Sequence, residues 1–173
     1  LNAIEEAAVD RLIADPDWAM QEKFDGRRIL IRKTSAQGGE VIGINRKGLV
    51  IPLPEPVAEC VRNLPSSGDD MILDGECIGD TYIVFDLLKL GGTDLRPRFY
   101  SVRLTTLADL IGQAEANSAV RLVKTVTGST QKQAFLAELR GRKAEGAVFK
   151  RLDAPYSAGR PASGGSQVKL KFT

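Results

Sequence analysis

Charged residues interrupt several otherwise apolar, strand-like runs of this sequence. They are lysines and carboxylates, and they include Lys23, Asp74, Glu76, Glu145, Lys150, Lys169 and Lys171. Any one of them could be an ordinary solvent-exposed residue. Side chains two residues apart lie on the same face of a strand, so Lys169 shares a face with Lys171, and Asp74 with Glu76. Lysines and carboxylates that converge on one sheet surface predict a site for a polyphosphate and its divalent metal.

The sequence contains no histidine, which excludes a histidine-assisted serine or cysteine nucleophile and any histidine-ligated metal. Its two cysteines, Cys60 and Cys77, form no CxxC pair. We therefore expect neither a disulfide framework nor a zinc site, and a reducing compartment is the default. An enzyme built from this sequence must use lysine, carboxylate, serine or tyrosine chemistry, or a metal held by oxygen ligands.

The composition predicts a packed globular domain. The 173 residues are 43% hydrophobic and 27% charged, which fits one domain of ordinary size. The net charge of +2 does not by itself indicate a nucleic-acid partner. We expect no membrane association, because no run approaches the roughly 20 apolar residues that span a bilayer and no leader-like segment opens the chain. The first residue is Leu1, so we expect a fragment or a processed product.

The elements that position these residues can be read from apolar periodicity and from turn residues. Helices are predicted at 3–14, 54–64, 101–113 and 130–143, and strands at 18–23, 28–33, 40–45, 71–77, 81–88, 120–126, 145–150 and 167–172. Turns are predicted at 37–39, 46–48 and 79–80, loops at 65–70 and 89–99, and a mobile Ala-, Pro-, Ser- and Gly-rich loop at 153–166. Hairpins with scattered helices predict an α+β fold with mostly antiparallel sheets flanked by helices.

Residues 23–28 (KFDGRR) match the KxDGxR signature of the covalent nucleotidyltransferases, which comprise the ATP- and NAD-dependent DNA ligases, the RNA ligases and the mRNA capping enzymes. Residues 73–76, 82–88, 145–150 and 169–171 resemble the family's other motifs in the family's order, and residues 45–48 resemble one more loosely. The chain is most similar to the small ATP-dependent DNA ligases, because VFDLL at 84–88 precedes a Gly-Gly turn. The resemblance implies an ATP-grasp-like adenylation domain over residues 1–173.

The resemblance also implies roles for individual residues. Lys23 would be the nucleophile, and since a free lysine is almost entirely protonated at neutral pH, nearby cations and desolvation would have to favour its neutral form. The implied nucleotide-binding residues are Gln21, Glu22, Arg28, Arg46, Glu76, Phe85, Lys150, Lys169 and Lys171. Gln21 would accept a hydrogen bond from the adenine amino group, and Phe85 would stack on the base, although core packing explains Phe85 equally well. Glu76 and Glu145 would hold Mg²⁺. Asp25, Gly26 and Asp74 would have supporting roles.

The implied reaction is three-step ligation with ATP as the AMP donor. Lys23 takes AMP, AMP passes to the 5′-phosphate of a nick in duplex DNA, and the 3′-hydroxyl displaces AMP. We expect a monomer acting in DNA repair, replication or recombination, in the cytoplasm of a bacterial or phage system or in a eukaryotic nucleus. Family members continue into an OB-fold domain that is absent here, so slow self-adenylylation and weak sealing are expected.

Three alternatives share features with this interpretation. An RNA ligase has the same motifs, and a nick-sealing assay with DNA and RNA strands separates the two. A capping guanylyltransferase is disfavoured by Gln21, and labelled ATP and GTP would distinguish it. A domain that only binds nucleotide would show binding without a covalent adduct.

Overall fold

A computed structural model describes residues 1–34, 40–65, 70–112, 118–159 and 164–172. Within the predicted single domain, the chain forms two compact units. Unit 1 comprises Leu1–Phe24 and Val123–Thr173, and unit 2 comprises Asp25–Leu122. The chain therefore leaves unit 1 directly after the KF of the first motif and returns to it inside the segment 120–126.

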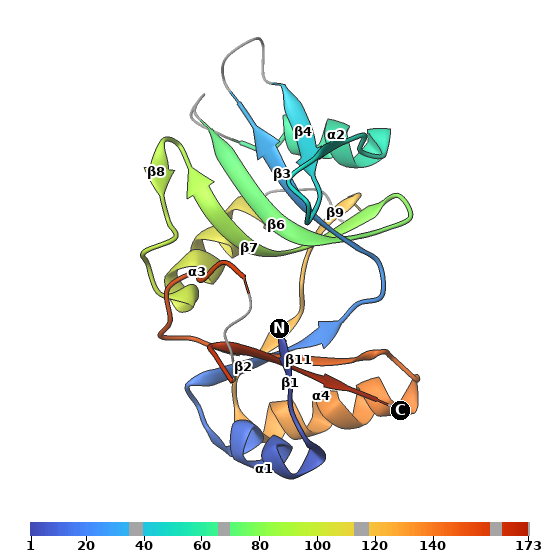
Figure 1. Ribbon diagram of the computed structural model, residues 1–173, viewed down its shortest axis with the longest axis vertical. Helices are drawn as coiled ribbons and strands as arrows, with labels where there is room; N and C mark the ends of the chain where they lie inside the picture. The colour runs from blue at the N-terminus through green and yellow to red at the C-terminus, as the bar shows by residue number, and fades with distance from the viewer. Residues whose placement is uncertain (35–39, 66–69, 113–117, 160–163, 173) are drawn as a thin grey trace. The chain divides into compact units, whose positions relative to one another are not determined.

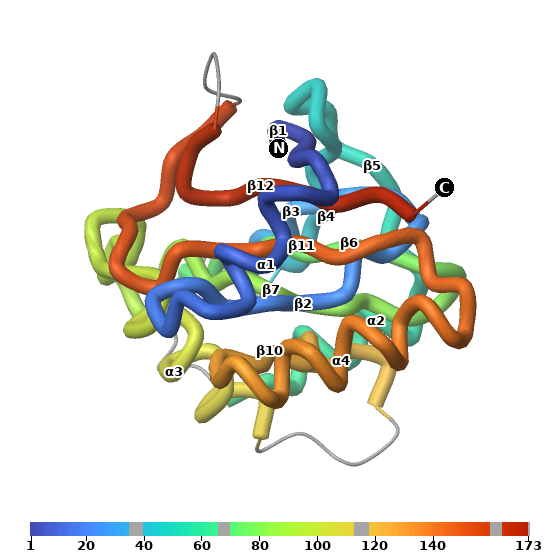
Figure 2. Tube along the Cα trace, turned by 90° about the horizontal axis from the view of Figure 1, so that it is seen from below, coloured from blue at the N-terminus to red at the C-terminus, as the bar shows by residue number. Residues whose placement is uncertain are grey.

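Unit 1 is built on a five-stranded sheet in the order β1-β12-β11-β2-β10. These strands are β1 (Asn2–Ala3), β12 (Gln167–Lys171), β11 (Gly146–Arg151), β2 (Trp18–Lys23) and β10 (Thr125–Val126). All neighbours are antiparallel except β1 and β12, which are parallel. Figure 2 shows β12, β11 and β2 running beside one another through the sheet.

Helices α1 (Glu6–Ala14) and α4 (Ser129–Gly141) cover one face of this sheet (Figure 1). Both segments consist mainly of good helix formers, and their apolar residues recur at helical spacing. The resulting core comprises Val9, Leu12, Ile13, Met20, Phe135, Leu139, Ala147, Phe149, Val168 and Leu170. Every second residue of β12 belongs to this core, so the intervening lysines occupy the opposite face.

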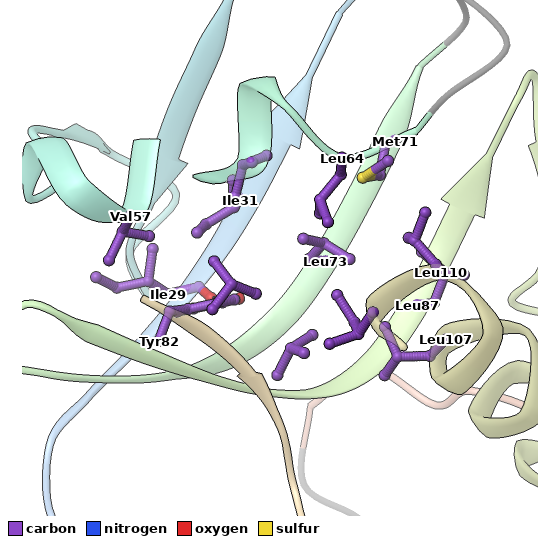
Figure 3. Packing of buried hydrophobic residues seen from close by; sticks show 14 of the residues in the cluster. Ile29, Ile31, Val57, Leu64, Met71, Leu73, Tyr82, Leu87, Leu107 and Leu110 are labelled. Carbon is purple, nitrogen blue, oxygen red and sulfur yellow. The ribbon is translucent and has the colours of Figure 1, made fainter. Parts of the chain in front are cut away.

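Unit 2 contains a larger sheet in the order β5-β4-β3-β6-β7-β8, with β9 parallel to β7. Its strands are β3 (Arg27–Lys33), β4 (Val41–Ile44), β5 (Val50–Ile51), β6 (Met71–Ile78), β7 (Thr81–Leu90), β8 (Thr93–Asp94) and β9 (Val120–Leu122). Helices α2 (Glu55–Arg62) and α3 (Tyr100–Ile111) pack on it through a core in which Ile29, Ile31 and Leu73 of the strands meet Val57 of α2 and Leu107 of α3 (Figure 3).

The α+β class with mostly antiparallel pairing is confirmed, and most predicted elements are present with ends shifted by one to three residues. The strand predicted at 120–126 is wrong as a single element: it is two short strands, β9 and β10, in different sheets. The apolar alternation of VRLVKTV continues across the boundary between the units, so periodicity alone does not reveal the break.

The predicted connection 89–99 is also corrected, because β7 extends to Leu90 and β8 follows the Gly-Gly turn. The short strands β1 and β5 were not predicted, since two residues carry too little pattern. The turn at 37–39, most of the loop 65–70, residue 113 of the third helix and residues 160–163 of the long loop lie outside the described residues. Among the described helices, none is long and apolar enough to cross a membrane.

Candidate active site

One face of the unit 1 sheet carries the predicted nucleophile, Lys23, and the three other lysines predicted for the site. Lys23 of β2 pairs with Gly146 of β11, and Gly146 pairs in turn with Lys171 of β12. Two residues earlier in β2, Gln21 pairs with Val148, which pairs with Lys169. Directly opposed residues share a face, so Lys23, Lys150, Lys169 and Lys171 project to one side of the sheet, which we call the lysine face. The shared face predicted for Lys169 and Lys171 is confirmed.

Gly146 lies between the two outer lysines of this face. A Cβ there would collide with the carbonyl oxygen of Leu170, so only glycine allows β11 and β12 to approach this closely. The absence of a side chain also leaves no bulk between Lys23 and Lys171. This explains physically why glycine follows Glu145 in the EGAVFK segment.

The Lys23 ammonium is bound to a carboxylate. Its Nζ lies 2.9 Å from Oε1 of Glu145, and Nζ of Lys171 lies 3.9 Å from the same oxygen. The Lys23 side chain is 20% exposed and that of Glu145 is 27% exposed, so the ion pair is reachable from solvent. The pair occupies the amine, so a reaction at Nζ of Lys23 would require the amine to leave Glu145.

Glu145 has the geometry expected of a metal-linked carboxylate. Its second oxygen, Oε2, is buried and accepts no hydrogen bond within the described residues. A buried carboxylate oxygen is costly to leave unsatisfied, and a bound cation would satisfy it. The described residues contain no cluster of three or more carboxylate or cysteine ligands that could hold a metal alone. A single carboxylate such as Glu145 could take part in holding Mg²⁺, which binds through one or two carboxylates together with substrate phosphates and water.

Gln21 is almost completely buried, with 2% of its surface exposed. Its Nε2 donates a hydrogen bond to Oγ1 of Thr125, 3.0 Å away on the neighbouring strand β10. Thr125 lies 104 residues from Gln21 in the chain, and it was not among the predicted site residues. No local signal identifies it, because its place opposite Gln21 depends on the pairing of β10 with β2.

The structure separates Glu22 from the other predicted nucleotide-binding residues of this sheet. Glu22 pairs with Ala147 and projects to the helix-covered side, opposite Lys23. Its Oε1 lies 2.5 Å from Nη2 of Arg142, which follows α4, and this hydrogen bond raises the pKa of Arg142. The alternation of β2 predicts this placement, since adjacent residues of a strand point to opposite faces. We therefore assign Glu22 to the packing of α4 against β2.

In unit 2, Arg28 is held by two groups. Its Nε and Nη2 donate to Oδ1 and Oδ2 of Asp74 at 3.1 and 2.6 Å, a bidentate pair in which Asp74 is buried. Its guanidinium also lies 5.5 Å from the centre of the Phe85 ring. Phe85 is the residue of β7 left unopposed at a bulge between the Asp74–Asp86 and Gly75–Val84 pairs. Asp74 therefore orients Arg28, and Phe85 stacks on the Arg28 guanidinium.

Glu76 lies on the same face as Arg28, because the two residues are directly opposed in β6 and β3. Its Oε2 accepts a hydrogen bond from the backbone N–H of Gly26 at 3.1 Å. A Cβ at Gly26 would collide with the carbonyl oxygen of Cys77, so the glycine of the KFDG segment is required by close backbone approach. Asp25 and Arg46 are exposed, and Arg46 lies in the turn between β4 and β5.

The predicted site residues thus fall into two groups. Lys23, Gln21, Glu145, Lys150, Lys169 and Lys171 belong to unit 1, and Asp25, Gly26, Arg28, Arg46, Asp74, Glu76 and Phe85 belong to unit 2. Within unit 1, the four lysines share one face, and Glu145 pairs with two of them, Lys23 and Lys171. Within unit 2, Arg28, Asp74 and Glu76 share one face.

Known proteins are similar to this chain in sequence and in fold. Residues 78–171 match the family model described as "ATP dependent DNA ligase domain". A probable DNA ligase of Anaeromyxobacter sp. (strain Fw109-5) is 32% identical over 202 residues, which cover 96% of this chain and 37% of the relative. One from Kineococcus radiotolerans is 31% identical, covering 88% of this chain and 33% of the relative. This chain therefore spans about a third of the length of these curated relatives.

Solved structures share the fold. The ligase domain of M. tuberculosis LigD has a TM-score of 0.68 at 24% identity, covering 89% of this chain and 54% of that one. The ATP-dependent DNA ligase of bacteriophage T7, in complex with ATP, has a TM-score of 0.66 at 12% identity, covering 98% of this chain and 67% of that one.

Proposed function

Because the chain belongs to the family of ATP-dependent DNA ligase domains, we propose that it is the adenylation core of a DNA ligase, with Lys23 as the residue that accepts AMP. The observation that carries the proposal is the environment of Lys23. Its amine is only partly exposed, lies on a face with three further lysines, and is paired at 2.9 Å with Glu145. This arrangement suits a lysine that must meet a negatively charged triphosphate.

In the first step, the neutral Lys23 amine attacks the α-phosphorus of ATP. A P–N bond forms, the bond from the α-phosphorus to the bridging oxygen breaks, and pyrophosphate leaves. The nitrogen, which is positively charged once the P–N bond has formed, then loses one proton to solvent or to a neighbouring base. Lys169 and Lys171 contribute positive charge toward phosphate oxygens from the same face. Glu145 would hold Mg²⁺, which would neutralise phosphate charge.

The later steps are proposed from the family relationship. AMP passes from Lys23 to the 5′-phosphate of nicked duplex DNA, and the 3′-hydroxyl displaces AMP to seal the nick. In unit 2, Arg28 and Glu76 are proposed to contact the nucleotide, and Phe85 to exchange the Arg28 guanidinium for the adenine ring. The curated relatives are about three times as long as this chain, so sealing is proposed for the whole protein, which we expect to include an OB-fold domain.

Intact mass spectrometry after incubation with ATP and Mg²⁺ tests the first step. The chain should gain the mass of one AMP, and Lys23→Ala should gain none. Lys124→Ala is the matched control in unit 1, because the Lys124 ammonium lies 4.6 Å from the centre of the Phe135 ring on the helix side of the sheet. An adduct that survives in Lys23→Ala, or one that forms with GTP rather than ATP, would contradict the proposal.

A sealing assay tests the substrate. Nicked duplexes with DNA or RNA strands should distinguish a DNA ligase from an RNA ligase, and the whole protein should seal the DNA nick. Rapid multiple-turnover sealing by residues 1–173 alone would contradict the expectation that another domain takes part.

A further inference from the structure

We infer that Tyr100 and Arg103 of α3 are positioning residues for nucleotide binding: together with Asp86, they hold a bulge of β7 in the shape that presents the Phe85 ring to the base. This inference rests on the part of the proposed function in which Phe85 stacks on adenine. Tyr100 and Arg103 act through Phe85 and take no part in the transfer of AMP. All four residues belong to unit 2.

The four residues are linked in a closed circuit of contacts. The Tyr100 hydroxyl donates a hydrogen bond to the carbonyl oxygen of Phe85 at 2.5 Å. The guanidinium of Arg103 lies 5.2 Å from the centre of the Tyr100 ring. Nε and Nη2 of Arg103 donate to Oδ1 and Oδ2 of Asp86 at 2.8 and 3.1 Å, and Asp86 follows Phe85 in the chain. Helix α3 therefore holds Phe85 both through its own carbonyl group and through the next residue.

The strand β7 has two bulges, and the segment that leads into α3 binds both of them. The register with β6 passes over Phe85 and Leu88. The carbonyl oxygen of Leu88 accepts a hydrogen bond from the backbone N–H of Leu95 at 2.8 Å, as that of Phe85 accepts one from Tyr100. Figure 1 shows α3 beside β7. A bulge re-aims the side chains around it, and a slip of one residue would turn them to the other face. These anchors therefore decide where the Phe85 ring points.

The Asp86–Arg103 pair supplies geometry more than stability. Arg103 is 1% exposed and Asp86 is 2% exposed. The cost of desolvation offsets much of the attraction in such a pair, so apolar residues of similar volume would stabilise the fold about as well. The bidentate contact, by contrast, holds the carboxylate in one orientation. Oδ1 of Asp86 also accepts a hydrogen bond from the backbone N–H of Leu87 at 2.9 Å. The fixed carboxylate therefore fixes the backbone directly after Phe85.

Arg103 also leaves Arg28 in place beside the Phe85 ring. Asp86 is directly opposed to Asp74, and like charges opposed across two strands repel each other. Each carboxylate has its own arginine, since Arg103 pairs with Asp86 and Arg28 pairs with Asp74. Neutralisation of Asp86 from α3 thus preserves the arrangement in which Arg28 lies 5.5 Å from the centre of the Phe85 ring. That ring is the surface that the base would meet.

Calorimetry with AMP tests the inference, because AMP carries the base but cannot adenylylate Lys23. Tyr100→Phe keeps the ring and removes the hydroxyl, and it should weaken AMP binding about fivefold, as expected for one hydrogen bond of about 1 kcal/mol. Tyr82→Phe is the matched control, because it removes the same kind of bond, from a buried tyrosine of β7 to the carbonyl oxygen of Ile29 at 2.7 Å. Its AMP affinity should stay within about twofold of the unmodified chain. Equal losses in the two variants, or no loss in Tyr100→Phe, would overturn the inference.

Removal of the aromatic ring separates positioning from a merely structural role. Phe85→Leu should weaken AMP binding about tenfold, the loss expected for one stack of a base on an aromatic side chain. In that background, Tyr100→Phe should change the affinity by less than about twofold, because no ring is left to position. Arg103→Lys keeps the charge but loses the bidentate contact, so it should weaken AMP binding only when Phe85 is present. Losses that are the same with and without Phe85 would rule out positioning.

The covalent adduct gives a second readout and separates the inference from the proposed function. A stack that persists through the transfer of AMP acts on binding, so Tyr100→Phe should raise the ATP concentration for half-maximal adduct formation about fivefold and leave the limiting rate within about twofold. If no adduct forms on Lys23 but AMP affinity depends on Tyr100 through Phe85, the proposed function fails and the inference stands. If the adduct forms while Tyr100→Phe binds AMP as tightly as the unmodified chain, the proposed function stands and the inference fails. Failure of the unmodified chain to bind AMP would also overturn the inference.

Discussion

Lys132 is a buried cation whose removal should destabilise unit 1. It lies in α4 with none of its side chain exposed, and its Nζ donates to the carbonyl oxygens of Leu12 at 2.8 Å, Asp15 at 2.7 Å and Trp18 at 2.9 Å. These carbonyls belong to the end of α1 and the start of β2, where no helical partner is available. One ammonium thus joins α4, α1 and the strand that carries Lys23. We predict that Lys132→Met costs about 3–5 kcal/mol of stability.

The magnitude follows from what methionine keeps and what it loses. The apolar part of the methionine side chain is similar in length to that of lysine, so the packing around position 132 is largely retained. Three charge-assisted hydrogen bonds disappear. The carbonyl of Asp15 keeps a hydrogen bond from the backbone N–H of Trp18, whereas a carbonyl left unpaired in the interior costs about 1–3 kcal/mol. Part of this loss is offset, because the variant no longer has to desolvate a buried ammonium. The expected net effect is a large fraction of the roughly 5–15 kcal/mol that stabilises a typical domain.

Urea unfolding followed by fluorescence measures this effect in the right unit, because Trp18 is the only tryptophan and belongs to unit 1. With a slope near 2 kcal/mol per molar urea, a loss of 3 kcal/mol lowers the midpoint by about 1.5 M. Gln133→Met is the control, since Gln133 is exposed one residue further along α4. A urea midpoint for Lys132→Met within about 0.5 M of the control would refute the reasoning. It would mean that the three hydrogen bonds of Lys132 stabilise the fold no more than the hydrogen bonds that the same groups make to water in the unfolded chain.

Two further changes test individual contacts. Burial raises the pKa of Tyr82 well above its usual value, and its hydroxyl donates to the carbonyl oxygen of Ile29 at 2.7 Å. The native state therefore holds this proton after the unfolded chain releases it, so stability should fall as pH rises above about 10. Tyr82→Phe should cost about 1 kcal/mol at pH 8 and less at pH 11, as followed by circular dichroism; a constant difference would contradict this. Lys143 has a φ of 57°, a left-handed backbone conformation that costs a residue with a side chain about 1 kcal/mol. Lys143→Gly should remove this strain and so raise the urea midpoint of the unfolding transition followed by Trp18 fluorescence. A lowered midpoint would contradict backbone strain at this position.

The local elements were predictable because their determinants are local. The strand over 18–23 has the predicted bounds, and the helix predicted at 130–143 is α4 at 129–141, since apolar period and helix formers decide these segments. The motif spacing predicts Lys23 and Glu145 as site residues, and strand alternation predicted that Lys169 and Lys171 share a face. Alternation also implies that Glu22 points to the face opposite Lys23, as the structure shows.

The contacts that define the chemistry depend on register and burial, which no local pattern encodes. Lys23 meets Glu145 across 122 residues, and Gln21 meets Thr125 across 104, only because β11 and β10 pair with β2 in one register. The burial of Lys132 was likewise invisible, since a lysine in a helix is ordinarily exposed.

The sequence by itself determined the fold class and most of the elements, and it predicts Lys23 as the nucleophile, because periodicity, turn residues and motif spacing are properties of short segments. Only the tertiary structure decided that Lys23 forms an ion pair with Glu145, that the segment 120–126 divides between two sheets, and that the Gln21 amide forms a hydrogen bond with Thr125. These outcomes follow from pairing between strands that are distant in the chain, and a shift of one residue in that pairing would turn every side chain to the other face.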